Sequence, residues 1–100
     1  MVQLSNVREV ELDDNRVKVG YSEQLSKYIM CITITEWLVD YDRWYSINET
    51  EFNDDELLRN IYNHINKDYK SDRFIFSWRK SENTDEQGKL LHSIVGDDIE

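Results

Sequence analysis

Hydrophobic and polar positions alternate through the first twenty residues of the chain. Val10 and Leu12 alternate with charged residues, and Val17 and Val19 alternate with polar residues after a short acidic stretch. A period of two residues is typical of strands that bury one face. The pattern therefore predicts a β-hairpin whose turn is Asp13-Asp14-Asn15.

The segment from Tyr28 to Leu38 is rich in β-branched residues and carries apolar side chains on both faces, which predicts a central strand. In the next stretch, Trp37 to Ile47, the apolar residues fit the repeat of a helix as well as that of a strand. Helical spacing fits Trp37, Leu38, Tyr41, Trp44 and Tyr45, whereas one strand face would hold Val39, Tyr41, Tyr45 and Ile47. Because Asp40 and Asp42 favour a turn, we expect a hairpin here rather than a helix.

An amphipathic helix is predicted after residue 53, since apolar residues recur at helical spacing opposite a polar face. The apolar positions are Leu57, Leu58, Ile61, Tyr62, Ile65 and Tyr69, and the polar ones are Arg59, Asn60, Asn63 and Asn66. Asn53 is the expected N-cap, with Glu56 completing a capping box.

Aromatic residues recur at every second position in Phe74, Phe76 and Trp78, between Arg73, Ile75, Ser77 and Arg79, which predicts a strand with an aromatic face. We expect a polar loop over 81–88 and a frayed tail over 96–100. The short run 90–95 fits either a return strand or a helical turn, and we favour the strand. The pattern thus predicts one α+β domain over residues 1–100: a small antiparallel sheet of five or six strands in hairpins, packed on one amphipathic helix.

Amino-acid composition limits the possible functions mainly through the net charge of the chain. The 100 residues are 39% hydrophobic and 12% aromatic, which suffices for one packed core. The net charge is −9, which argues against direct binding to nucleic acid or to an anionic membrane. Cys31 is the single cysteine and lies in an apolar run, so it is expected to be a small core residue. With no signal-peptide pattern and no long apolar segment, we expect a cytoplasmic protein.

The sequence contains no complete motif for metal binding or catalysis. Asp40, Asp42 and Glu51 match the first, third and twelfth positions of a calcium-binding loop, but Trp44 and Tyr45 occupy positions that need an oxygen ligand and a glycine. His64 and His92 are the two histidines, and His64 is expected to be a half-buried packing residue. We therefore expect no metal, no cofactor and no enzymatic activity.

Acidic residues are concentrated in one segment of the chain. Residues 36–56 hold eight acidic residues and one basic residue, whereas residues 57–80 hold six basic and two acidic residues. The acidic segment also carries aromatic residues, which often anchor interfaces. The candidate partner-binding residues are Glu36, Asp40, Tyr41, Asp42, Trp44, Glu49 and Glu51.

In size, acidity and expected fold, the chain is similar to bacterial immunity proteins that neutralise toxins, and to phage-encoded inhibitors of host defence nucleases. The resemblance implies a small acidic protein-binding domain that acts as a stoichiometric inhibitor. Its partner would be a protein with a basic site, such as a toxin nuclease. The alternative is a structural or adaptor subunit, or a homo-oligomer, without catalytic activity.

Overall fold

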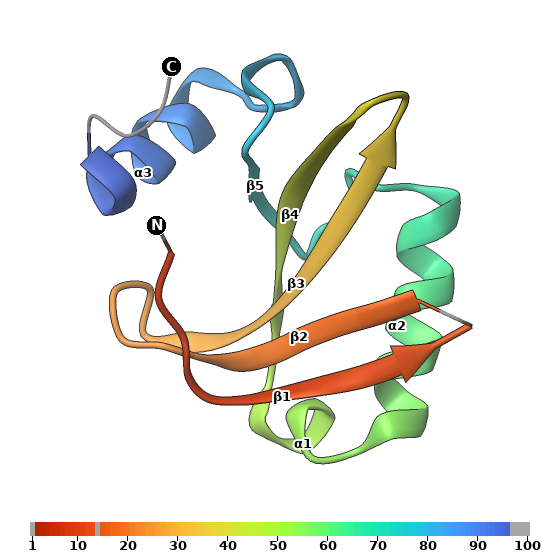
Figure 1. The fold of residues 1–100 in the computed structure, drawn as a ribbon. Coiled ribbons are helices and arrows are strands. Elements are labelled where there is room, and N and C mark those ends of the chain that lie inside the picture. The colour runs from red at the N-terminus through yellow and green to blue at the C-terminus, as the bar shows by residue number, and fades with distance from the viewer. Residues whose placement is uncertain (1, 14, 97–100) are drawn as a thin grey trace.

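The computed structural model describes residues 2–13 and 15–96, so Asp14 of the predicted turn and residues 97–100 of the predicted tail lie outside the described residues. Five antiparallel strands form one sheet in which strand order equals chain order (Figure 1). The strands are β1 (Ser5–Leu12), β2 (Asn15–Ser22), β3 (Lys27–Glu36), β4 (Val39–Ile47) and β5 (Phe74–Ser77). The helical elements are α1 (Glu49–Phe52), α2 (Asp55–Lys67), the 3-10 turn η1 (Lys80–Glu82) and α3 (Asp85–Val95).

The first predicted hairpin is confirmed, and a second hairpin is present with its turn earlier in the chain than expected. In the first, Val10 lies opposite Val17, so that their side chains share one buried face. In the second, Glu36 pairs with Val39 and leaves a two-residue turn, Trp37-Leu38. The expectation that Asp40 and Asp42 form the turn is therefore wrong, because both lie within β4 opposite residues of β3.

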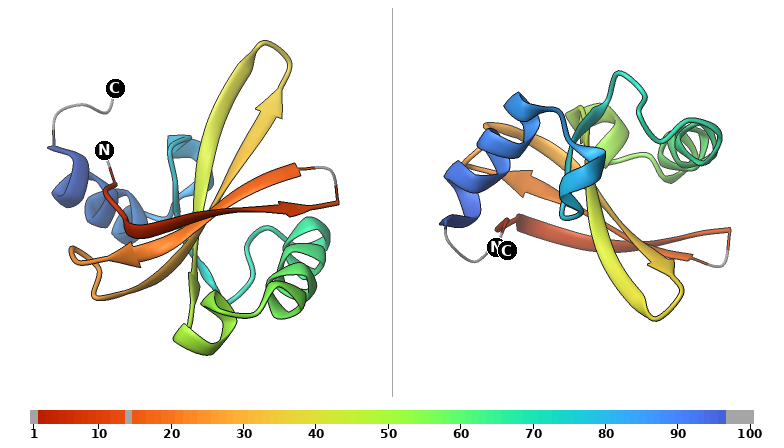
Figure 2. Two further views of the ribbon diagram at one scale, coloured as in Figure 1. Left: turned by 60° about the horizontal axis from the view of Figure 1, so that its bottom comes forward. Right: turned by 90° about the horizontal axis from the view of Figure 1, so that it is seen from above.

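The sheet buries side chains on both of its faces. Ile29 and Met30 are neighbours in β3 and are both fully buried, so they point to opposite faces. Met30 packs in a core with Leu58 and Ile61 of α2. Ile29 packs in a second core with side chains of α3 and of the N-terminal segment, which are Leu91, Val95 and Val2. Helices α2 and α3 therefore cover opposite faces of the sheet (Figure 2).

Helix α2 forms as predicted but begins one residue later. Asp54 is its N-cap, and its side chain accepts hydrogen bonds from the amides of Glu56 and Leu57. Asn53, the predicted N-cap, instead ends the short helix α1. The capping box expected for Asn53 and Glu56 occurs earlier, between Asn48 and Glu51 at the start of α1.

The C-terminal region differs from the prediction. The expected loop over 81–88 is wrong, because η1 ends at Glu82 and α3 begins at Asp85. The favoured strand over 90–95 is also wrong, and the helical alternative for that run is correct, because α3 continues to Val95. Thr84 and Gln87 form a capping box that starts α3. Leu91 and Val95, one helical turn apart, then bury their side chains against the sheet. The sheet therefore packs on several helices rather than one.

Candidate partner-binding site

The outer half of the β3–β4 hairpin projects beyond the rest of the sheet (Figures 1 and 2). The β2–β3 pair nearest the hairpin tip is Val17 with Ile32, and the corresponding β4–β5 pair is Arg43 with Ser77. Among the described strands, residues 33–42 thus pair only with one another. We call residues 33–42 the hairpin arm. The arm is placed where its outer end can reach another molecule.

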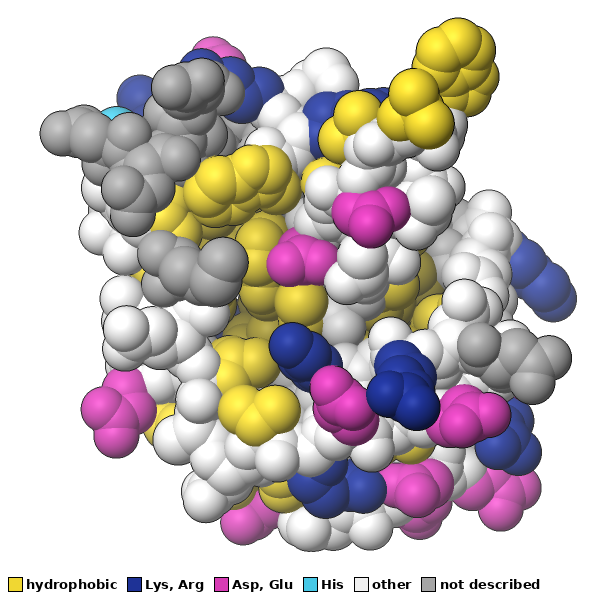
Figure 3. Space-filling view, in the orientation of Figure 1, with side chains coloured by type: hydrophobic (Ala, Val, Ile, Leu, Met, Phe, Trp, Pro, Cys, Tyr) yellow, Lys and Arg dark blue, Asp and Glu magenta, His cyan; other side chains and the backbone are white. Residues whose placement is uncertain are grey.

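The tip of the hairpin arm exposes large apolar side chains. Trp37 and Leu38 are each 92% exposed, and Val39 is 56% exposed. Figure 3 shows hydrophobic side chains projecting at the upper right of the molecule, where the β3–β4 hairpin ends in Figure 1. Apolar surface is normally removed from water on folding. Two adjacent, almost fully exposed residues of this kind therefore contribute little to the stability of the isolated domain.

Trp37 also has an unfavourable backbone conformation. Its φ is 62°, in the left-handed region. A two-residue hairpin turn with positive φ favours glycine or asparagine, and a bulky residue in this region costs about 1–2 kcal/mol. A tryptophan at this position is therefore poorly explained by the turn itself. A large exposed side chain at a strained turn is instead typical of a site that binds another molecule.

Arg79 connects the hairpin arm to the body of the protein. Its Nη1 donates a hydrogen bond to Glu36 Oε2 at 3.1 Å, and its guanidinium lies over the ring of Tyr41, 4.5 Å from the centroid. Glu36 belongs to β3 and Tyr41 to β4. The backbone amide of Trp78 also donates to the carbonyl of Asp42 at 2.9 Å. The segment just after β5 therefore holds both strands of the arm.

A buried ion pair lies beneath the base of the arm. Arg43 Nε and Nη2 donate to the two carboxylate oxygens of Glu82 at 2.8 and 2.6 Å, and the Tyr41 hydroxyl donates to Glu82 Oε2 at 2.8 Å. The side chains of Arg43 and Glu82 are 13% and 9% exposed. Burial alone would raise the pKa of Glu82, but hydrogen bonds from Arg43, Ser77 and Tyr41 lower it to about 2. Glu82 is therefore a charged structural anchor.

A hollow runs along the face of the sheet beside the arm. One part, of about 370 Å³, is lined by Val2, Asp40, Tyr41, Asp42, Trp44 and Trp78. A second part, of about 470 Å³, shares three of these residues and continues toward β1 and β2. Figure 3 shows hydrophobic side chains along this face with acidic and basic side chains beside them. The hollow therefore provides a concave surface beside the projecting arm.

The structure brings together only part of the predicted site. Asp40, Tyr41, Asp42 and Trp44 line the same hollow, and Glu36 lies on the neighbouring strand of the arm. Glu49 and Glu51 instead lie on α1, which follows the other end of β4 (Figure 1). Glu51 is bound by Arg73 at 2.7 Å, and this partner, together with the amide of Asn48, lowers its pKa against the effect of burial.

Two of the predicted contact residues are buried. Tyr41 and Trp44 are each 5% exposed, and the Trp44 ring packs edge-on against Phe76 with centroids 5.3 Å apart. These rings support the arm from within the fold. Of the aromatic residues in the acidic segment 36–56, Trp37 is the one whose ring is exposed. Trp37 and Leu38 were absent from the predicted site because their exposure depends on the hairpin register, which periodicity alone left open between strand and helix.

No protein-family model, no curated protein and no solved structure matches this chain. Three features of the described residues favour partner binding at this end of the molecule. These are the exposed tip, the arm held by Arg79, and the hollow lined by Asp40 and Asp42.

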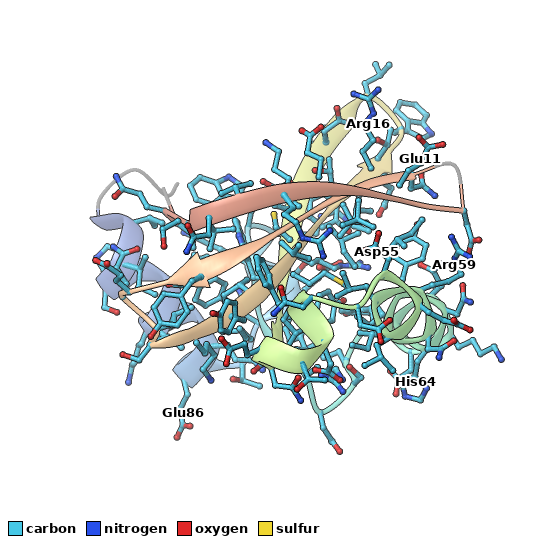
Figure 4. All side chains as sticks on the ribbon, turned by 90° about the horizontal axis from the view of Figure 1, so that it is seen from below. Glu11, Arg16, Asp55, Arg59, His64 and Glu86 are labelled. Carbon is cyan, nitrogen blue, oxygen red and sulfur yellow. The ribbon has the colours of Figure 1, made fainter. Side chains whose placement is uncertain are left out.

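The residues considered for metal binding or nucleophilic chemistry are dispersed. His64 is exposed and points outward from α2 (Figure 4), so the expectation of a half-buried packing residue is wrong. Cys31 is half-buried and lines the hollow, where burial raises its pKa to about 12. Over residues 2–13 and 15–96, no three His, Cys, Asp or Glu side chains are grouped so as to hold a metal ion. Within the same residues, no helix has the length and apolar character needed to cross a membrane.

Proposed function

We propose that this domain binds a partner protein and acts as a stoichiometric inhibitor, with the tip of the hairpin arm occupying a basic site of the partner. The proposal is carried by one observation: Trp37 and Leu38, adjacent at the end of a projecting arm, are each 92% exposed. The class of partner that fits best is a nuclease, either a bacterial toxin or a defence enzyme.

The tip supplies the apolar part of the interaction. Tryptophan is among the residues most enriched at energetic hot spots of interfaces, where its ring is buried in a pocket of the partner. In the free domain the Trp37 ring is solvated, so nearly all of its surface is available for burial on binding. Leu38 and Val39 extend the same apolar tip.

Charge indicates the sign of the partner surface. The chain carries a net charge of −9. In the hairpin arm, Glu36 is paired with Arg79, whereas Asp40 and Asp42 have no ion pair among the described residues. Unpaired carboxylates beside an apolar tip complement a pocket with cationic walls and would accelerate association. Nuclease clefts have this character because they bind a polyanion.

A second function of the same tip is self-association, as a homo-oligomer or an adaptor subunit without catalytic activity. The exposed Trp37 and Leu38 favour it for the same reason that they favour partner binding. Salt distinguishes the two functions. Association steered by charge slows as ionic strength rises, whereas an apolar contact between two acidic copies does not weaken.

The decisive experiment compares three forms of the domain. They are the native chain, the tip double variant Trp37→Gly with Leu38→Ser, and the control Leu90→Ser, which removes a partly exposed leucine on α3 far along the chain. Each form is used to capture proteins from a native lysate, and the nuclease activity of the captured protein is then titrated with each form.

The proposal expects one captured protein that is retained by the native chain and by Leu90→Ser but lost by the tip variant. It also expects nuclease inhibition that saturates at a one-to-one ratio. Equal retention by all three forms would contradict it. Concentration-dependent dimers in sedimentation experiments, lost in the tip variant and insensitive to salt, would instead establish self-association.

A further inference from the structure

We infer that the hairpin arm enters its partner as a preformed wedge, and that Arg79 is the positioning residue that holds it in shape. This inference rests on the proposed function and adds the kind of partner that the site fits. A rigid wedge requires a cavity that already exists in the partner, with an apolar floor for Trp37 and Leu38.

Among the described residues, no strand pairs with either side of the hairpin arm. Its residues 33–42 pair only with one another among the described strands. An isolated two-stranded hairpin is marginally stable in water. The order of the arm must therefore come from contacts outside its own ladder.

Those contacts come from the segment that follows β5. Arg79 binds Glu36 on β3 by an ion pair and Tyr41 on β4 by stacking, so one guanidinium joins both strands of the arm. The amide of Trp78 is hydrogen-bonded to the carbonyl of Asp42. At the base of the arm, Glu82 accepts hydrogen bonds from the Tyr41 hydroxyl and the Arg43 guanidinium in a site with little solvent exposure.

The Arg79 contact also makes the arm electrically asymmetric. Glu36 is ion-paired with Arg79, whereas Asp40 and Asp42, which line the hollow on the sheet, form no ion pair among the described residues. Complementary charge on the partner should therefore lie on the side of the hollow. The partner that fits is a cavity with an apolar floor and a cationic wall on the side that meets Asp40.

Holding the arm in shape before binding lowers the entropy that association must overcome. Ordering a loop and its side chains at the moment of contact reduces affinity, and a preorganised element avoids that loss. An arm that lost its Arg79 contacts would still carry the same apolar tip, but it would bind more weakly.

The first test uses the free domain and needs no partner. Nitrogen-15 relaxation is measured for the Trp37 indole and for the amides of residues 35–40 in the native chain, in Arg79→Gln and in Arg59→Gln. Arg59 is an exposed arginine on α2, which makes it a matched control. We expect ordered signals in the native chain and in Arg59→Gln, and nanosecond mobility confined to the arm in Arg79→Gln. An arm that is mobile in the native chain, or equally ordered in all three forms, would overturn the inference.

The second test measures affinity for the captured partner. Arg79→Gln should weaken binding by roughly tenfold while the thermal midpoint changes little, because the ion pair is partly exposed. Arg79→Lys retains the charge but loses the planar stacking, so its affinity for the partner should lie between those of the native chain and Arg79→Gln. If Arg79→Gln binds as the native chain does while the tip variant does not, the wedge inference fails and the proposed function stands. If the tip variant also binds normally, the proposed function itself fails.

Discussion

Glu82 and Arg43 are 39 residues apart in the chain and share two hydrogen bonds, at 2.8 and 2.6 Å, in a site where neither side chain is more than 13% exposed. The pair joins η1 to the centre of β4. It satisfies the rule that a buried charge needs both a partner and hydrogen bonds. Among the described residues, no buried side-chain nitrogen or oxygen is left without a hydrogen bond.

Stability should fall in acid because of Glu82. Its pKa is about 2 in the folded domain and about 4.5 in an ordinary glutamate, so the folded state favours the charged form. This contribution is fully present above about pH 4.5 and is lost as the pH falls toward 2. Its size is about 3 kcal/mol. Denaturant unfolding at pH 7, 5, 4, 3 and 2 should show this decline.

The matched variants for this prediction are Glu82→Gln and Glu86→Gln. Glu86 is exposed and projects from α3 (Figure 4). Glu82→Gln should lower the free energy of unfolding at pH 7 and flatten its acid dependence, whereas Glu86→Gln should do neither. An acid profile that is the same in both variants would rule out Glu82 as the cause.

Trp37 and Trp44 should respond in opposite ways to truncation. Trp44 is buried against Phe76, so Trp44→Ala should cost about 3–5 kcal/mol of stability. Trp37 is exposed at a positive φ that suits glycine, so Trp37→Gly should change stability by less than about 1 kcal/mol. Urea unfolding of both variants would measure the difference. A loss above about 2 kcal/mol for Trp37→Gly would show that the tip is structural.

Within α2, Leu58 should matter more than Leu57. Leu58 is fully buried in the core beneath the helix, whereas Leu57 is only half-buried at its edge. Leu58→Ala should cost about 2–5 kcal/mol, and Leu57→Ala clearly less. Thermal unfolding of the two variants checks the order. Equal losses would mean that α2 is rotated relative to the sheet.

Charge reversal should separate the two ends of the acidic segment. Asp40→Lys changes the hairpin arm beside the hollow, whereas Glu49→Lys changes a residue on α1 that is also exposed. Association of the captured partner at low salt should slow severalfold for Asp40→Lys and change little for Glu49→Lys. Surface plasmon resonance at two salt concentrations measures this. Equal slowing by both variants would indicate attraction by net charge without a defined site.

Elements with a strong local pattern could be predicted from the sequence. The alternation around Val10 and Val17 specified the first hairpin, and the spacing of Leu58, Ile61 and Ile65 specified α2. Helix α3 could not be identified in the same way, because its buried face consists only of Leu91 and Val95 and a glycine interrupts it. Its start is set by the Thr84–Gln87 capping box, a short signal within a polar stretch.

The candidate site was predictable in composition but not in arrangement. Acidic and aromatic residues are indeed close together around Asp40 and Trp44. The charge count could not show that Glu51 lies on α1 and is bound to Arg73, nor that Glu36 is bound to Arg79. Nor could it place Trp37 at the turn, because that depends on the register that pairs Glu36 with Val39.

The order of the strands has a consequence for how the chain reaches its native state. Strands β1 to β4 form successive hairpins, so each pairs with its nearest neighbour in the sequence. Contacts between nearby residues close short loops and form quickly. Strand β5 can join β4 only after the 26 residues that carry α1 and α2 have been spanned, and Arg79 and Glu82 follow β5. The hairpin that presents Trp37 would therefore form early in folding, and its final orientation would be set late.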